Sequence, residues 1–240
     1  IKIYFGILIL FLFSILIFYL LVDSPIFQIR EFKISGAQRL GNEEVLKILS
    51  PVILKTRTAI FLGMNNLFIW NEKKPDVSKS ALLEASIRRE WLGQSVVIII
   101  KERDRLVIWC RINSPCYWID KDGMAFEEAP ETEGSLILTI QDNSPENLAQ
   151  GEKVTESRFV ENLSAILEGI LELKIPAKKI VFDKKLQEVR VESYSGPDYF
   201  FSTRFNPKLN LESLKSLEEK VDLKRAGYFD LRIENRIFYK

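Results

Sequence analysis

Few side chains in this chain of 240 residues are of the types that do chemistry. It has no His and 2 Cys, and its 34 Lys and Arg balance 33 Asp and Glu to a net charge of +1. Without His, a Ser-His-Asp or Cys-His nucleophile and a His-bound zinc site are excluded. Two cysteines are too few for an all-thiolate zinc or iron–sulfur site, which takes four. Carboxylates and lysines are left for catalysis, and the balanced charge argues against a nucleic-acid partner.

One acidic segment has the opening pattern of a calcium-binding loop. Asp120-Lys-Asp122-Gly123 begins like such a loop, but Met124 and Ala125 stand where the loop needs an oxygen ligand and a Gly. We interpret the segment as a tight hairpin turn, in which Gly123 accepts a positive φ without steric cost. No metal or cofactor is expected here.

The adjacent acidic pairs at residues 43–44 and 127–128 do not form a catalytic pair of carboxylates. Neighbouring residues point to different sides of an element, whereas a glycosidase needs two carboxylates that face one substrate. We interpret both pairs as solvated surface, and Trp109 and Trp118 as packing residues rather than a sugar-binding platform. The sequence therefore predicts neither enzymatic activity nor a small-molecule substrate.

Two alternatives remain for Cys110 and Cys116, which flank a predicted hairpin turn at residues 113–115. In an exported domain a disulfide can persist. However, a three-residue turn would pair Ile112 with Cys116 and leave Cys110 diagonal to it, which is poor disulfide geometry. We expect buried free thiols, with a disulfide as the alternative.

An uncharged apolar run of 20 residues extends from Ile3 to Val22. As a helix it would be roughly 30 Å long, which matches the hydrocarbon core of a bilayer. A cleaved signal peptide is the competing interpretation, but the run is too long and no small-x-small cleavage site follows it. We expect an uncleaved anchor in the lipid bilayer through residues 3–22. Lys2 on one side and Asp23 on the other place the N-terminus in the cytoplasm and the body outside. The sequence begins with Ile, so we expect further residues of a cytoplasmic tail before it.

Beyond the anchor, hydrophobic periodicity predicts a mixed α+β chain. Residues 51–64 are apolar but aperiodic and receive no assignment.

Three helices have a predicted N-terminal cap. We expect Asn42 to cap a helix that Pro51 ends, Thr155 to cap the helix at 156–173, and Asn210 to cap the last helix. A further helix is predicted within residues 76–84. Strands are predicted at 27–36, 85–89, 95–103, 106–112, 116–119, 124–126, 136–140, 179–183, 188–192 and 199–203, with two short ones at the end.

Several short motifs occur along the chain in a fixed order. They are Phe27-x-Ile29-x-x-Phe32-x-Ile34-x-Gly36, Arg39-Leu40, Glu43-Glu44-Val45-Leu46, Asn66-Leu67-Phe68, Ala85-x-Ile87-x-Arg89-x-Trp91, Ile98-x-Ile100-x-Glu102-Arg103, Val107-x-Trp109, Trp118-Ile119-Asp120-x-Asp122-Gly123-x-x-Phe126 and Asp230-Leu231-Arg232. In this order they resemble the bacterial cell-division protein family FtsQ/DivIB. The first half resembles that family's POTRA domain, and the second half its β domain.

The resemblance implies three parts: an anchor at residues 1–23, a POTRA-like βααββ domain at 24–103 and a mixed β domain with two packed helices at 104–240. It also implies a non-enzymatic single-pass scaffold of the inner membrane, located at the division septum. Such a protein would bind the FtsB/FtsL (DivIC/FtsL) pair by adding a partner strand to its last strand, and would link that pair to the septal peptidoglycan synthase.

The expected partner-binding residues lie at the C-terminal end. An edge strand offers unpaired N–H and C=O groups to a partner strand. The alternative is that Ile233, Ile237 and Tyr239 merely complete the core. The residues assigned to partner binding are Ile233, Asn235, Arg236, Ile237, Phe238, Tyr239 and Arg204, and those assigned structural roles are Gly36, Asp122, Gly123, Asp230, Leu231 and Arg232.

Two other functions compete with the scaffold. A membrane-anchored peptidoglycan hydrolase would use a Glu as its acid, but the sequence shows no carboxylate in a recognisable cleft motif. A POTRA-bearing outer-membrane assembly component would need a C-terminal series of roughly 10-residue transmembrane strands, and residues 104–240 carry too much helix and charge for that.

Overall fold

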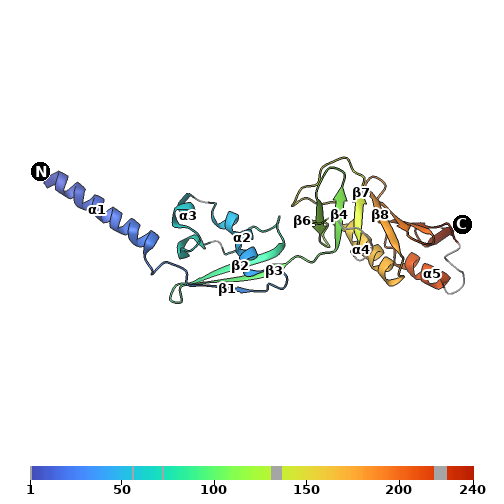
Figure 1. Ribbon diagram of the computed structural model, residues 1–240, viewed down its shortest axis with the longest axis horizontal. Coiled ribbons are helices and arrows are strands. Elements are labelled where there is room, and N and C mark those ends of the chain that lie inside the picture. The colour runs from blue at the N-terminus through green and yellow to red at the C-terminus, as the bar shows by residue number, and fades with distance from the viewer. Residues whose placement is uncertain (1, 56, 72, 131–136, 219–225) are drawn as a thin grey trace. The chain divides into compact units, whose positions relative to one another are not determined.

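The chain folds as two units, residues 1–102 and 103–240. The structure, a computed structural model (Figure 1), describes residues 2–55, 57–71, 73–130, 137–218 and 226–240. Both units combine helices with β-sheet, so the predicted mixed α+β class is confirmed. Each unit is described by itself.

The first unit begins with the apolar helix α1 (Lys2–Asp23). Its segment Tyr4–Asp23 has a mean hydropathy of 3.0, and none of it is buried against the rest of the protein. The helix is thus long and apolar enough to cross a membrane. Ser14 does not interrupt it, because its hydroxyl donates to the carbonyl of Leu10 within the helix.

After α1, the first unit packs helices onto one three-stranded sheet. The sheet has the order β1-β3-β2, with β1 parallel and β2 antiparallel to the central β3. Leu49 of α2, Leu67 of η1, Leu82 of β2 and Ile98 of β3 are all buried in one core. The elements are β1 (Glu31–Ser35), α2 (Asn42–Ile53), α3 (Arg57–Leu62), the 3₁₀ helix η1 (Leu67–Ile69), β2 (Leu82–Glu90) and β3 (Ser95–Glu102).

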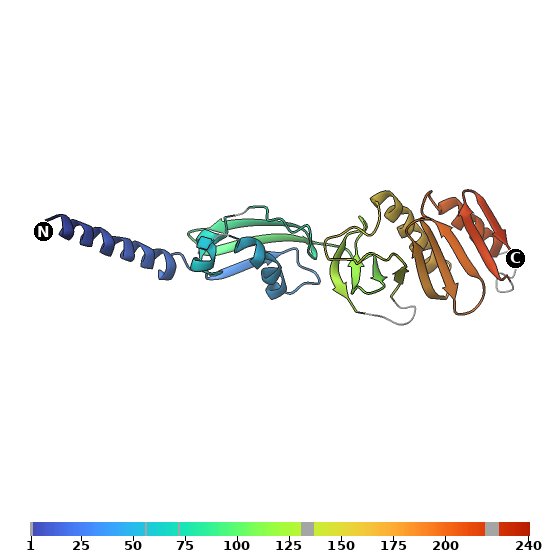
Figure 2. The same cartoon turned by 90° about the horizontal axis from the view of Figure 1, so that it is seen from above.

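The second unit is a nine-stranded sheet with two helices, α4 (Ser157–Glu172) and α5 (Lys208–Glu218), against one face (Figure 2). The strand order is β12-β11-β10-β9-β8-β7-β4-β5-β6. Gly169 allows the two helices to approach, because a Cβ there would lie 2.7 Å from the Leu211 side chain. The strands are β4 (Val107–Arg111), β5 (Cys116–Ile119), β6 (Ala125–Ala129), β7 (Thr139–Asp142), β8 (Ala177–Asp183), β9 (Glu188–Ser193), β10 (Asp198–Ser202), β11 (Tyr228–Ile233) and β12 (Arg236–Tyr239).

The helix predicted within residues 76–84 is wrong. Residues 78–81 form a turn and a bend, in which the backbone N–H of Ser80 donates to the carbonyl of Val77, and β2 begins at Leu82. The reason lies in the tertiary structure. Residues Leu82 to Glu90 of β2 pair with the long strand β3, which is rich in β-branched residues, and this pairing outweighs the helical preference of the short segment.

Pro51 does not end its helix, which continues to Ile53. A Pro at this position cannot donate to the carbonyl four residues earlier. The Ser50 hydroxyl donates to that carbonyl, on Lys47, at 3.0 Å instead. The unassigned residues that follow contain α3.

The three predicted caps are wrong. Gly41, and not Asn42, occupies the N-cap position of α2, and neither Thr155 nor Asn210 caps a helix. Thr155 is buried and its hydroxyl hydrogen-bonds the side chain of Gln187, while Glu156 occupies the N-cap position of α4. Asn210 lies inside α5 and is buried, with its side chain engaged elsewhere in the unit. Both polar side chains find tertiary partners that local sequence does not reveal.

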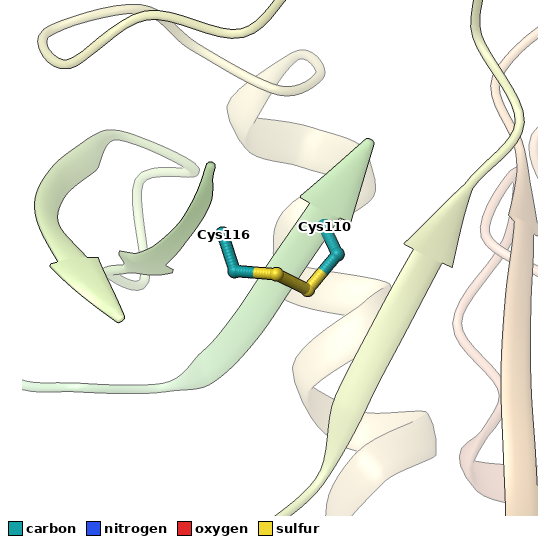
Figure 3. Close-up of a disulfide and its surroundings, with 2 residues drawn as sticks. All are labelled: Cys110 and Cys116. Carbon is teal, nitrogen blue, oxygen red and sulfur yellow. A yellow bond between two sulfur atoms is a disulfide. The ribbon is translucent and has the colours of Figure 1, made fainter. Parts of the chain in front are cut away.

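The expectation of free thiols is also wrong. Cys110 and Cys116 form a disulfide that bridges β4 and β5, with their Cα atoms 4.3 Å apart (Figure 3). The reason is register: Trp109 pairs with Tyr117, which places the two cysteines directly opposite each other. The connecting turn is longer than the three residues expected.

Candidate docking edge at the C-terminus

The last strand lies at one edge of the large sheet. Within the described residues, β12 pairs with β11 only, in an antiparallel hairpin. The turn between them contains Asn235 with φ 57°, a conformation that Asn tolerates better than most residues. The outer side of β12 therefore presents backbone N–H and C=O groups that no described strand satisfies.

The side chains of the hairpin divide between the two faces of the sheet. Phe238 lies opposite Asp230 on the face away from the helices, and Tyr239 lies opposite the buried Phe229 with ring centroids 5.7 Å apart. Ile237 packs against the core. About half of the surface of Ile233 (51%), Phe238 (47%) and Tyr239 (52%) is exposed. A purely structural role, in which the side chain only completes the core, therefore fits Ile237 better than Phe238.

Asn210 holds this hairpin to α5, and sequence reasoning missed it. Its side-chain N–H₂ donates to the carbonyls of Leu231 (3.1 Å) and Ile233 (2.9 Å). Its side-chain carbonyl accepts the backbone N–H of Asn235 at 2.8 Å. A buried amide can satisfy several backbone groups at once, so this residue fixes where the edge lies.

A network of ion pairs lies on the face of the sheet beside the edge strand β12. The Arg232 guanidinium donates two hydrogen bonds to Asp230 (2.9 and 2.6 Å) and one to Glu188 (3.0 Å). Arg204 reaches the same Glu188 at 3.5 Å, so its positive charge is joined to the network. The hydrogen bonds from Arg232 outweigh the effect of burial and hold the pKa of Asp230 below its ordinary value. Leu231, between the two charged residues, points into the core.

Aromatic rings extend this face. Phe200 on β10 lies between two guanidinium groups, with Arg190 at 5.6 Å and Arg232 at 5.2 Å from its ring centroid. Tyr228 meets the same ring edge-on at 6.2 Å. The face of an aromatic ring attracts such cations electrostatically. The result is a braced, amphipathic surface directly beside the open strand.

The hairpin turn at Asp122 and Gly123 is present, but its main polar residue is Asp120. Asp120 is buried, pairs with Arg103, and accepts the backbone N–H groups of Asp122 and Met124, each at 2.9 Å. Asp122 itself is exposed. Gly123 has φ 75°, and a Cβ there would lie 2.7 Å from Val160. Within the described part of the chain, no group of acidic or Cys side chains could hold a metal ion.

In the first unit, Glu102 organises the chain after Gly36. Its carboxylate accepts the backbone N–H groups of Gln38, Arg39 and Leu40 at 2.8, 3.0 and 3.0 Å. Burial alone would raise the pKa of Glu102, but these hydrogen bonds hold it below the ordinary value. The Glu of the Ile98–Arg103 segment thus has a structural role, which its charge alone did not reveal.

A surface cavity of about 530 Å³ between α4 and α5 contains several carboxylates. Among them, Glu172 accepts a hydrogen bond from Lys215 at 2.8 Å, which lowers the pKa of Glu172. A catalytic acid needs the opposite shift, so that it stays protonated near neutral pH. Glu172 therefore lies in an ion pair with Lys215 and does not show the pKa shift of a catalytic acid.

No protein-family model matches this chain, and no curated protein is significantly similar to it. The chain is a mixed α+β protein. Among the residues that the structure describes, one helix, at the N-terminus, could span a membrane, and β12 pairs with no strand but β11 at an edge of the large sheet.

Proposed function

We propose that this protein is a non-enzymatic, single-pass scaffold of bacterial cell division similar to FtsQ/DivIB. It binds the FtsB/FtsL (DivIC/FtsL) pair through strand addition at β12 and links it to the septal peptidoglycan synthase. The observation that carries the proposal is the open edge of β12, held in place by Asn210 and flanked by half-exposed Phe238 and Tyr239. Strand addition takes affinity from backbone hydrogen bonds and specificity from side chains on alternate faces.

The first unit supports the same family. After α1, its elements are a strand, two α-helices, a short 3₁₀ helix and two strands, with the first strand parallel to the last, which is central in the sheet. Apart from the 3₁₀ helix, this order agrees with the βααββ arrangement that the resemblance to a POTRA domain implies. POTRA modules are docking units, so a second partner surface is consistent with a scaffold.

The disulfide supports an extracytoplasmic body. Disulfides persist in oxidising compartments and are rare in the cytosol. A bond between Cys110 and Cys116 agrees with the orientation expected from Lys2 and Asp23, in which residues after α1 lie outside the cell membrane. Anchoring there confines the scaffold and its anchored partners to one thin layer, which raises their effective concentration.

The test is binding of the FtsB/FtsL-like pair to point variants of the full chain in detergent. Deleting residues 233–240 would uncover Phe229 and remove all partners of Asn210 in the hairpin except the carbonyl of Leu231, so a substitution on the exposed face is a sharper test. We expect Phe238→Glu to weaken binding at least tenfold, because a charge replaces an aromatic contact beside the added strand.

The matched control is Leu186→Glu, which changes a similarly exposed apolar residue (54%) in the turn between β8 and β9. It should bind like the wild type. Equal affinity of wild type and Phe238→Glu, with both proteins folded by circular dichroism, would rule out docking at this edge.

A further inference from the structure

In the part of the first unit that follows α1, the exposed large apolar side chains are concentrated at one end. Of the seven large apolar residues exposed within the described part of 24–102, only Ile99, halfway along β3, lies elsewhere. We name the other six the basal patch: Ile26, Ile60, Phe61, Phe68, Trp91 and Leu92. Their exposed fractions run from 37% for Phe68 to full exposure for Leu92.

Several contacts draw the basal patch together. Phe68 contacts Phe27 and Trp91, with ring centroids 4.8 and 5.3 Å apart. Leu92 lies in the β2–β3 turn beside Trp91. The same turn is tied to the segment after α1, because the Gln94 side chain donates to the carbonyl of Ile26 at 2.8 Å.

The basal patch also lies where α1 joins the unit. The buried Asn66 donates to the carbonyl of Leu21 at 2.7 Å, and Gln28 donates to that of Val22 at 2.7 Å. Both acceptors are in the last turn of α1. The short helix α3, which carries Ile60 and Phe61, contacts both α1 and η1.

This placement sets the depth of the patch relative to a bilayer. Ile26 follows the end of α1 by three residues, a distance of at most roughly 11 Å along an extended chain. The headgroup layer on each side of a bilayer is about 5–8 Å thick. If α1 spans the membrane, the basal patch therefore lies in or next to the headgroup layer.

The chemistry of the patch suits that layer. Aromatic rings with a polar edge are enriched at membrane interfaces, and long basic side chains extend from there to water. Trp91 is of this type, and the Arg89 guanidinium lies 4.9 Å from its ring centroid. Lys55, shortly before α3, and Arg57, the first residue of α3, are both exposed and add positive charge that attracts anionic lipid.

We infer that the basal patch is a membrane-binding surface that rests in the phospholipid headgroup layer and holds the first unit against the bilayer. The inference rests on the proposed membrane anchor. It adds that the folded unit itself, and not α1 alone, contacts lipid. The height of the unit above the membrane is then fixed rather than left to a free linker.

The test uses the full chain reconstituted at low protein density in vesicles of phosphatidylethanolamine and phosphatidylglycerol, with and without brominated phospholipid. Bromine quenches only those tryptophans that contact lipid. We expect the difference spectrum between wild type and Trp91→Phe, which isolates Trp91, to lose more than half of its intensity in brominated vesicles. Burial of Trp91 against another protein chain would instead protect it.

A matched pair of variants completes the design. Leu92→Glu should reduce the quenching of Trp91 at least twofold, whereas Ile99→Glu, which changes the exposed residue outside the basal patch, should leave it unchanged. An unquenched Trp91 in the wild type would overturn the inference.

Extraction of vesicles with alkaline carbonate tests the anchor separately. A chain that is washed off the vesicles contradicts the proposed function. A chain that is retained but has an unquenched Trp91 contradicts only the inference.

Discussion

Asn210 accepts the backbone N–H of Asn235 at 2.8 Å, although the two residues lie 25 positions apart in the chain. Its amide also donates to two carbonyls of β11, so one buried side chain joins α5 to the hairpin that forms the open edge. The position of the proposed docking edge therefore depends on a residue that is not itself exposed.

Replacing Asn210 with Ala should destabilise the second unit by about 1–3 kcal/mol, because buried backbone groups lose their partners. Urea denaturation of the full chain in detergent measures the change, and binding of the FtsB/FtsL-like pair should weaken with it. Leu209→Ala, at the exposed neighbouring position, should change stability by less than about 0.5 kcal/mol. Equal stability of the two variants would contradict the role given to Asn210.

The disulfide between Cys110 and Cys116 should stabilise the second unit by about 2 kcal/mol, since it closes a short loop in the unfolded chain. Adding a reductant to the wild type should lower the urea midpoint, whereas a Cys110→Ala/Cys116→Ala variant should not respond. A thiol titration of the unfolded protein should find no free thiol before reduction. Detection of two free thiols in protein purified from the oxidising compartment would contradict the bond.

Asp142 should make the second unit sensitive to acid. Burial raises the pKa of Asp142, but hydrogen bonds from Ser144, Arg111 and Trp109 outweigh it and hold that pKa below the ordinary value. A depressed folded-state pKa gives stability that is complete above the unfolded pKa of about 3.9 and is lost as pH falls through the folded pKa. Thermal melts between about pH 2.5 and 7 should show this loss on the acid side.

Asp142→Asn should remove part of that acid-side dependence and cost about 3–5 kcal/mol at neutral pH, because Arg111 then stays buried without its counter-ion. The double variant Asp142→Asn/Arg111→Met should recover much of the loss. If the single variant were as stable as wild type at pH 7, the ion pair would not support the fold.

Gly36 and Gly63 allow backbone strain to be separated from crowding in the first unit. Both have positive φ, but a Cβ at Gly36 would lie 2.0 Å from the carbonyl oxygen of Ile100, whereas nothing lies within 4 Å at Gly63. Gly63→Ala should cost about 1–2 kcal/mol for the left-handed backbone. Gly36→Ala should cost about 1–3 kcal/mol more, because β1 must move away from β3. Hydrogen exchange of the β3 amides measures the loss of stability in both variants. Similar exchange rates in the two variants would show that the contact between a Cβ at position 36 and Ile100 costs little free energy.

The sequence by itself determined the elements whose signal is local. The uncharged run before Asp23, the apolar stripe of α4 and the β-branched residues of β3 each carry a period or a composition that specifies a helix or a strand without help from distant residues. The two strands at the C-terminus were predicted for the same reason, because a turn at residues 234–235 separates two apolar stretches.

Only the tertiary structure decided what depends on partners far along the chain. The register between β4 and β5 places Cys110 opposite Cys116. Residues 82–84 are strand because they pair with β3. Asn210, expected to cap a helix, is buried and instead hydrogen-bonds the C-terminal hairpin. The strand order likewise left β12 at the edge, and contacts with the end of α1 brought the basal patch together. Hydrogen bonds and packing between distant segments have no sequence period, so their outcome is fixed only when the whole unit folds.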